Sequence, residues 1–271
     1  MTTPDPLNAK SYLAEVLGDS GSPVVLIPGG AAQSKTFYPH LEKALTHRHR
    51  VVLVDRQGTG RAAGLGRASL SSGSAAYAEV LGELNAGPAL VVAQSLGGAM
   101  ALQLVLDHPE LVSGLVLIDP TPVNSPVTMR TIGPIAKVLF GPLGLPLIGR
   151  PLEALMTRRS GAAVDDEGRA SLEAMIDSRG LYLTSKALGS LPAEAAALTK
   201  RLTRLDIPVV VLTADRKPTH GVRRAHEQLV ARLGGRLVTW PGAVHGEHLR
   251  EPAKVVDLVE SVLHEVPQSD S

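Results

Sequence analysis

The chain has 271 residues, 44% of them hydrophobic, and its 27 basic residues nearly balance its 26 acidic ones. The absence of cysteine excludes disulfides, thiolate metal sites and a cysteine nucleophile. The near-zero net charge and the scarcity of aromatic residues argue against a nucleic-acid partner, which would need a basic footprint and stacking surfaces.

Residues 1–6 contain neither a basic segment nor an apolar run, so we expect no secretory signal and a cytoplasmic location.

The first part of the chain alternates between two kinds of segment. Continuous apolar runs follow, each typical of a strand buried on both faces of a parallel sheet. The predicted strands are Val24–Ile27, Val51–Val54, Leu90–Val92 and Leu115–Ile118, and the predicted helices between them are Phe37–Leu45, Ala75–Leu84 and Leu96–Asp107.

A long segment, from about Thr121 to Lys200, interrupts this alternation. It contains an apolar stretch, Ile132 to Gly149, that is long enough to span a membrane. Its prolines and glycines would break a spanning helix repeatedly, so we expect no membrane insertion and interpret the stretch as a mobile flap. Helix-prone pieces follow at Ser171–Met175 and Ala193–Leu205. We therefore predict that residues 122–200 form a helical cap.

The alternation resumes after this insertion, with predicted strands at Val209–Leu212 and Arg236–Trp240 and predicted helices at Arg223–Leu233 and Ala253–His264. Alternating strands and helices are typical of βαβ units. We therefore predict an α/β fold with a doubly wound, mostly parallel sheet, whose core comprises residues 1–121 and 201–271.

The most informative segment is Leu90-Val-Val-Ala-Gln-Ser-Leu-Gly-Gly-Ala99, in which a predicted strand runs through Ser95 directly into a helix. Such a turn strains the serine backbone and requires small residues two positions before and after it, as Ala93 and Gly97 are. The turn would expose the hydroxyl and aim a helix N-terminus at a developing oxyanion. Ser95 could instead be an ordinary N-cap. The pair Gly97-Gly98, which is costly in a helix, favours a nucleophile.

This segment resembles the nucleophile turn G-x-S-x-G of the α/β-hydrolase fold superfamily, and of its serine esterases in particular, with Ala93 in place of the first glycine. Val51 to Gly60 resembles the strand and turn that precede this unit. Pro241 to Pro252 resembles the loop that carries the catalytic histidine. The resemblance extends from about Val24 to the C-terminal helix and implies that fold, with an inserted cap.

A competing pattern occurs at Gly58-Thr-Gly-Arg-Ala-Ala63, which fits G-x-G-x-x-A after a strand, with Glu79 near the position of a ribose contact. Gly64 and Gly66 would prevent a helix from beginning there. Without a helix N-terminus nothing would hold a pyrophosphate. We therefore expect neither a dinucleotide nor any other cofactor.

The resemblance makes His245 the general base that takes the proton of Ser95, since imidazole titrates near neutral pH. His248, three residues later, is the competitor, and we interpret the other histidines as structural or solvated. The cluster His245-Gly-Glu-His248 matches neither HExxH nor HxxEH, so no metal site is expected.

The acid that would orient the histidine is open between two residues that end predicted strands. Asp119 directly follows Leu115–Ile118, at an alternative acid position that some family members use. Asp215 follows Val209–Leu212, but the usual acid lies a few residues further on, where this chain has Lys217. We favour Asp119 and keep Asp215 as the alternative.

The resemblance also implies an oxyanion hole made by the backbone amides of Leu96 and Gly30, although Gly29-Gly30 could equally be a plain turn. We therefore expect a serine hydrolase that forms an acyl-enzyme with a small apolar ester, lactone or thioester. The poorly matched acid position leaves two alternatives, a slow or non-catalytic small-molecule receptor and a cofactor-free C–C hydrolase or lyase. The sequence does not indicate the oligomeric state.

Overall fold

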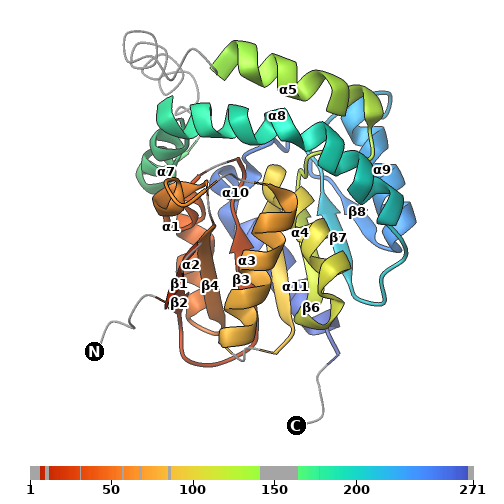
Figure 1. Cartoon of the computed structure of the whole chain (residues 1–271). Helices are drawn as coiled ribbons and strands as arrows, with labels where there is room; N and C mark the ends of the chain where they lie inside the picture. The colour runs from red at the N-terminus through yellow and green to blue at the C-terminus, as the bar shows by residue number, and fades with distance from the viewer. Residues whose placement is uncertain are drawn as a thin grey trace.

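A single sheet forms the centre of the computed structural model (Figure 1). The structure describes residues 7–9, 12–30, 32–56, 58–66, 69–84, 87–140, 164–176 and 178–267. Within these residues the sheet has eight strands in the order β1-β2-β4-β3-β5-β6-β7-β8. The strands are β1 (Leu7–Ala9), β2 (Tyr12–Leu17), β3 (Pro23–Ile27), β4 (Arg50–Arg56), β5 (Ala89–Gln94), β6 (Val112–Ile118), β7 (Val209–Leu212) and β8 (Arg236–Val238).

Strands β3 to β8 pair in parallel, whereas β1 and β2 form an antiparallel edge on β4. This arrangement confirms the predicted α/β class and all six predicted strands. The two edge strands were not predicted. β1 has three residues, and in β2 buried and half-buried positions alternate at first, a weaker signal than a continuous apolar run.

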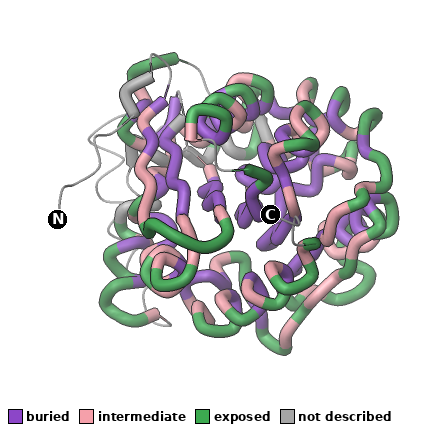
Figure 2. Tube along the Cα trace, turned by 90° about the horizontal axis from the view of Figure 1, so that it is seen from below, coloured by how far each residue is buried: buried purple, intermediate pink, exposed green. Residues whose placement is uncertain are grey.

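Helices cover both faces of the sheet and leave the strands in the interior (Figures 1 and 2). In β3, Val25 and Ile27 belong to the hydrophobic cluster on one face, and Val24 and Leu26 to the cluster on the other. The helices are α1 (Ser34–Phe37), α2 (Pro39–Thr46), α3 (Leu70–Glu83), α4 (Leu96–Asp107), α9 (Gly221–Leu233), α10 (Glu247–Arg250) and α11 (Pro252–Glu265). The prediction of strands buried on both faces is therefore confirmed.

The helix predicted at Phe37–Leu45 is in fact two helices. α1 ends at Phe37, and α2 begins at Pro39 after Tyr38 adopts a non-helical backbone conformation. Proline has no N–H to donate to the preceding turn, but it is well tolerated as the first residue of a helix. The apolar spacing of the segment continues across this break, which is why it predicted one helix.

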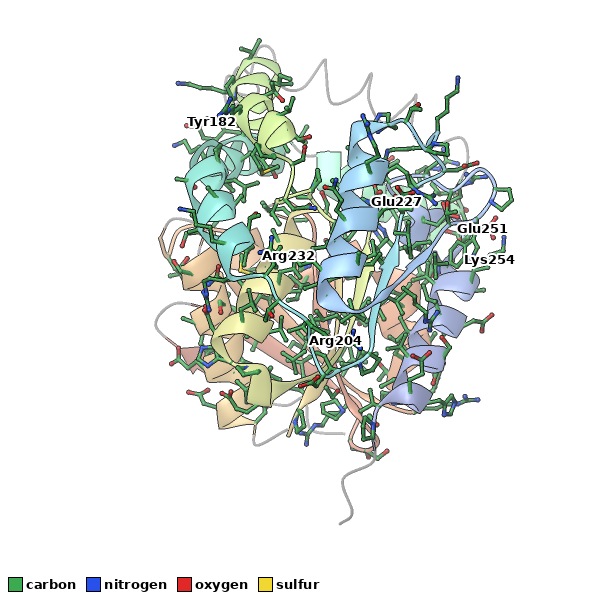
Figure 3. The ribbon with its side chains drawn as sticks, turned by 90° about the vertical axis from the view of Figure 1, so that its right-hand side faces the viewer. Tyr182, Arg204, Glu227, Arg232, Glu251 and Lys254 are labelled. Atoms are coloured by element: carbon green, nitrogen blue, oxygen red, sulfur yellow. The ribbon has the colours of Figure 1, made fainter. Side chains whose placement is uncertain are left out.

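Among the described residues between β6 and β7 there are three helices: α5 (Pro126–Phe140), α7 (Asp166–Ile176) and α8 (Ser178–Arg201). They lie across one end of the sheet (Figure 1). On its return to the sheet the chain is held by Arg232 of α9, whose Nε donates to the carbonyl oxygen of Leu202 at 2.8 Å (Figure 3). The described part of the insertion thus consists largely of helices, and a cap at 122–200 stays a prediction.

The apolar stretch Ile132 to Gly149 was predicted to be a flap, but its first part is helix. α5 continues to Phe140 with the exposed Pro134 inside it. α8 likewise begins at Ser178 and continues through Pro192. One proline removes one helical hydrogen bond, which the remaining turns can tolerate. Residues 141–149 lie outside the described part of the chain. Within the described part, no helix is long and apolar enough to cross a membrane.

At Gly97, α4 comes very close to the backbone at the end of β3. A Cβ atom at this position would lie 2.6 Å from the carbonyl oxygens of Ile27 and Pro28. We expect Gly97→Ala to lower the free energy of unfolding by about 1–3 kcal/mol, measured by denaturant unfolding. Gly189→Ala in α8 is the control, since a Cβ there meets nothing within 4 Å. It should raise that free energy by about 0.5–1 kcal/mol. Equal effects would contradict the close approach.

Candidate active site

Ser95 lies in a strained turn between β5 and α4. Its backbone has φ 51° and ψ −118°, and among the described residues other than glycine only Asp119 shares a positive φ, at 43°. Such conformations cost about 1–3 kcal/mol each and persist where the surrounding structure enforces them. The surrounding structure must therefore hold the backbone of both residues in place.

Small residues permit this turn. Ala93 is fully buried in β5, and a side chain at Gly97 would collide with the loop after β3. A Cβ atom at Gly98 would lie 2.5 Å from the Cβ of Pro120, in the segment after β6. The Gly97-Gly98 pair is thus required by backbone packing on two sides of α4.

The segment after β6 runs alongside Ser95. The N–H of Ser95 donates to the carbonyl oxygen of Ile118 at 3.1 Å, and the N–H of Thr121 donates to the carbonyl oxygen of Ser95 at 2.8 Å. Asp119 lies between these two bonds. The backbone of the second strained residue is therefore fixed against that of the first.

The carboxylate of Asp119 accepts hydrogen bonds from three residues on two loops. Its Oδ2 receives Nδ1 of His245 at 2.6 Å, and its Oδ1 receives the N–H of Ala214 at 3.1 Å. Arg216 donates Nη1 to Oδ1 at 2.5 Å and Nη2 to Oδ2 at 2.7 Å. Burial acts to raise the pKa of this carboxyl, but Arg216 and His245 outweigh it and hold the pKa far below its ordinary value.

His245 lies on the loop between β8 and α10, and its side chain is 56% exposed. The ring meets Asp119, while the carbonyl oxygen of His245 accepts Nε2 of the buried Gln94 at 2.9 Å. Gln94 immediately precedes Ser95. The His245 loop is thus tied both to the residue before Ser95 and to the segment that runs beside it.

The alternative acid, Asp215, faces another way. Its Oδ2 accepts the N–H of Gly242 at 2.8 Å, and its own N–H donates to the carbonyl oxygen of Ala243. Asp215 therefore braces the turn that precedes His245, and the structure gives it no contact with the imidazole. Lys217, at the position of the usual acid, is exposed.

The competing histidine, His248, is a core residue. Its fully buried ring stacks on Phe37 with a centroid distance of 4.7 Å and an interplanar angle of 12°, and meets Tyr38 edge-on. Burial lowers the pKa of His248 to about 3, because the protonated ring would lose its hydration. A side chain in this position packs α10 against α1 and α2 and is closed to a substrate.

The two predicted oxyanion donors lie on separate elements. Leu96 is the first residue of α4, where a backbone N–H has no partner within the helix. Gly30 follows β3 with φ 56°, and a Cβ atom there would lie 2.7 Å from Oγ1 of Thr184 on α8. Glycine is therefore required at this position, and α8 packs directly on the loop.

The competing dinucleotide pattern lacks the helix that it needs. After β4 the chain forms a short 3₁₀ turn, Gly60–Ala62, and the next helix, α3, begins at Leu70. The buried Asp55 accepts Nε of Arg61 and the N–H of Ser34, both at 2.7 Å. Gly58 and Gly60 therefore belong to a loop that the buried Asp55 holds by hydrogen bonds.

Three residues near the site were not singled out in the sequence: Gln94, Arg216 and His226. Burial disfavours the charged form of His226 and so lowers its pKa. Its ring contacts Oγ1 of Thr213 at 2.9 Å and the carbonyl oxygen of Pro120 at 2.8 Å. One signal for Arg216 existed. Its loop follows β7, the parallel neighbour of β6, and the carboxyl ends of such strands meet at one edge of a sheet.

A family model described as the alpha/beta hydrolase family matches residues 24–258. The chain belongs to this family, which confirms the family that the sequence resembled and the fold that the resemblance implied.

Individual similarities are more distant. The chain is 24% identical over 260 residues to a candidate non-heme haloperoxidase of Mycobacterium phage D29, covering 90% of this chain and 88% of that one. It is 33% identical over 110 residues to the sn-1-specific diacylglycerol lipase ABHD11 of Mus musculus, covering 40% and 36%. An alpha/beta hydrolase fold protein from Burkholderia ambifaria superposes with a TM-score of 0.72 at 22% identity, over 96% of this chain and 98% of that one. At that identity the superposition shows the common fold.

The depressed pKa of His248 predicts a pH dependence of stability. Between pH 6.5, the ordinary histidine pKa, and about 3, the unfolded chain binds a proton at His248 that the folded chain does not. The free energy of unfolding should therefore fall as pH falls, by up to about 1.4 kcal/mol per pH unit from this group. His248→Met should flatten the profile measured by urea unfolding from pH 7 to 4. Parallel profiles for the two proteins would contradict the burial of this ring.

Proposed function

We propose that this alpha/beta-hydrolase-family protein is a serine hydrolase that cleaves a small apolar carboxylic ester, lactone or thioester through an acyl-enzyme. The observation that carries the proposal is the hydrogen bond from Nδ1 of His245 to the buried carboxylate of Asp119, beside the strained Ser95 turn. An imidazole held in this way has its Nε2 lone pair available as a base. The insertion between β6 and β7 is rich in Leu, Ile, Val and Met, which favours an apolar substrate.

In the proposed reaction His245 takes the proton of the Ser95 hydroxyl as the oxygen attacks the substrate carbonyl carbon. Asp119 stabilises the imidazolium that forms. The amides of Leu96 and Gly30 receive the negative oxygen of the tetrahedral intermediate. The intermediate collapses to an acyl-enzyme, and His245 returns the proton to the leaving alcohol or thiol. Water, activated by His245, then releases the carboxylic acid and restores Ser95.

The comparisons support carbonyl chemistry of this kind without selecting a substrate. The mouse relative is named a diacylglycerol lipase, and the name therefore favours an ester. The phage relative carries a haloperoxidase name. An ester-type substrate is favoured here because the strained Ser95 turn and the pair of His245 and Asp119 suit acyl transfer.

Substitution of the proposed nucleophile tests the reaction. Ser95→Ala should lower the release of p-nitrophenol from p-nitrophenyl acetate by about 10⁴-fold or more, because no covalent route remains. It should also abolish labelling by a fluorophosphonate probe, detected by mass spectrometry. The control is Ser190→Ala, an exposed serine of α8, which should match the wild type. Labelling of Ser95 without turnover would indicate a receptor, and labelling of neither protein would refute the nucleophile.

Two asparagine substitutions test the choice of acid. Asp119→Asn should lower kcat for the same ester by about 10⁴-fold, since an amide favours the wrong tautomer of His245. Asp215→Asn should change kcat by less than about fivefold, because Asp215 braces Gly242 instead. A larger loss in the Asp215 variant than in the Asp119 variant would reverse the assignment.

A further inference from the structure

Arg216 binds both carboxylate oxygens of Asp119, but it has no role in the proposed reaction. Its two Nη atoms meet the two carboxylate oxygens at 2.5 and 2.7 Å, with the carboxylate 3% and the arginine side chain 22% exposed. A planar guanidinium that binds both oxygens fixes the plane of the carboxylate as well as its position. A lysine, with a single charged nitrogen, cannot do both.

The orientation of the carboxylate matters because the two oxygens have different partners. Ala214 donates to Oδ1, whereas His245 must meet Oδ2. The bond from Ala214 alone would leave the carboxylate free to rotate about its last torsion. The strained backbone of Asp119, at φ 43°, also needs bonds that hold it. Arg216 supplies the second anchor, which stops the rotation.

We propose that Arg216 is a positioning residue of this site: its bidentate bond to Asp119 aims Oδ2 at His245, and its charge weakens the hold of Asp119 on the protonated imidazole. The inference rests on the proposed function. It also explains how the loop after β7 takes part in the site, by contributing a cation that clamps the aspartate after β6.

The second effect follows from the charges around Asp119. Arg216 and His245 share the carboxylate. His226 lies 3.9 Å from its Oδ1, and burial lowers the pKa of His226. His248 also faces His245, and burial lowers its pKa to about 3. Two nearby carboxylates, Asp215 and Glu247, accept backbone N–H groups of their own loop. Arg216 is therefore the charge that opposes formation of an imidazolium beside Asp119. Removing that charge favours the protonated form of His245, which cannot act as a base. The fall of activity towards low pH, the acid limb of the pH profile, should therefore move to higher pH.

The experiment compares Arg216→Met, Arg216→Lys and a control in which another ion pair is removed. Arg216→Met should lower kcat by about 10²-fold, the typical cost of a misplaced catalytic group, with KM changed by less than about threefold. The acid limb of kcat/KM should rise by about 0.5–1 pH unit. Arg216→Lys keeps the charge, so it should restore the limb while recovering kcat in part.

The control is Arg223→Met, which removes the 2.8 Å pair with Glu227 on α9 (Figure 3). It should leave kcat and the acid limb at wild-type values. A result in which Arg216→Met lowers the thermal midpoint but leaves both kcat and the limb unchanged would reduce Arg216 to a structural residue and overturn the inference.

A second readout keeps this inference separate from the proposed function. The His245 ring can be titrated by ¹⁵N NMR without any turnover, with its signal assigned by its loss in His245→Gln. Arg216→Met should move that titration to higher pH in the same direction as the activity limb. An unmoved titration overturns the inference even if the protein is an esterase. If Ser95→Ala keeps full activity, the proposed function fails while the titration still tests Arg216.

Discussion

Burial of the Asp119 carboxylate places a charge where water cannot solvate it, and the site depends on how the fold compensates that charge. Hydrogen bonds from Ala214, Arg216 and His245 saturate the two oxygens and keep the group ionised. The same bonds fix a backbone conformation that aspartate would otherwise avoid. An apolar residue here would leave three donors without their acceptor, so the His245 loop, the β7 loop and the segment after β6 all depend on this one side chain.

The parallel sheet explains why these groups meet. Strands β5, β6 and β7 are neighbours, and their carboxyl ends present Ser95, Asp119 and Arg216 at one edge. Gln94 then joins this edge to the His245 loop through the carbonyl oxygen of His245. The close approach of backbones around α4 requires glycine at two successive positions, which is where the sequence places them.

Local patterns predicted most of the core. Continuous apolar runs identified the parallel strands β3 to β7, because residues buried on both faces need no alternation. The same patterns failed where one local rule competed with a wider context. The prolines of Ile132 to Gly149 were expected to break a helix, yet α5 continues through Pro134. At Pro39 the opposite occurred, since a break lies inside an unbroken apolar spacing.

The sequence by itself predicted the class of fold, the serine turn and the loop that carries His245, because each depends on a local pattern of neighbouring residues. Tertiary structure decided which aspartate contacts His245, which of two histidines is buried, and that Arg216 clamps Asp119. These contacts join residues 126 and 97 positions apart. Their geometry depends on strand register and on the direction of each loop, neither of which leaves a local pattern for the sequence to show.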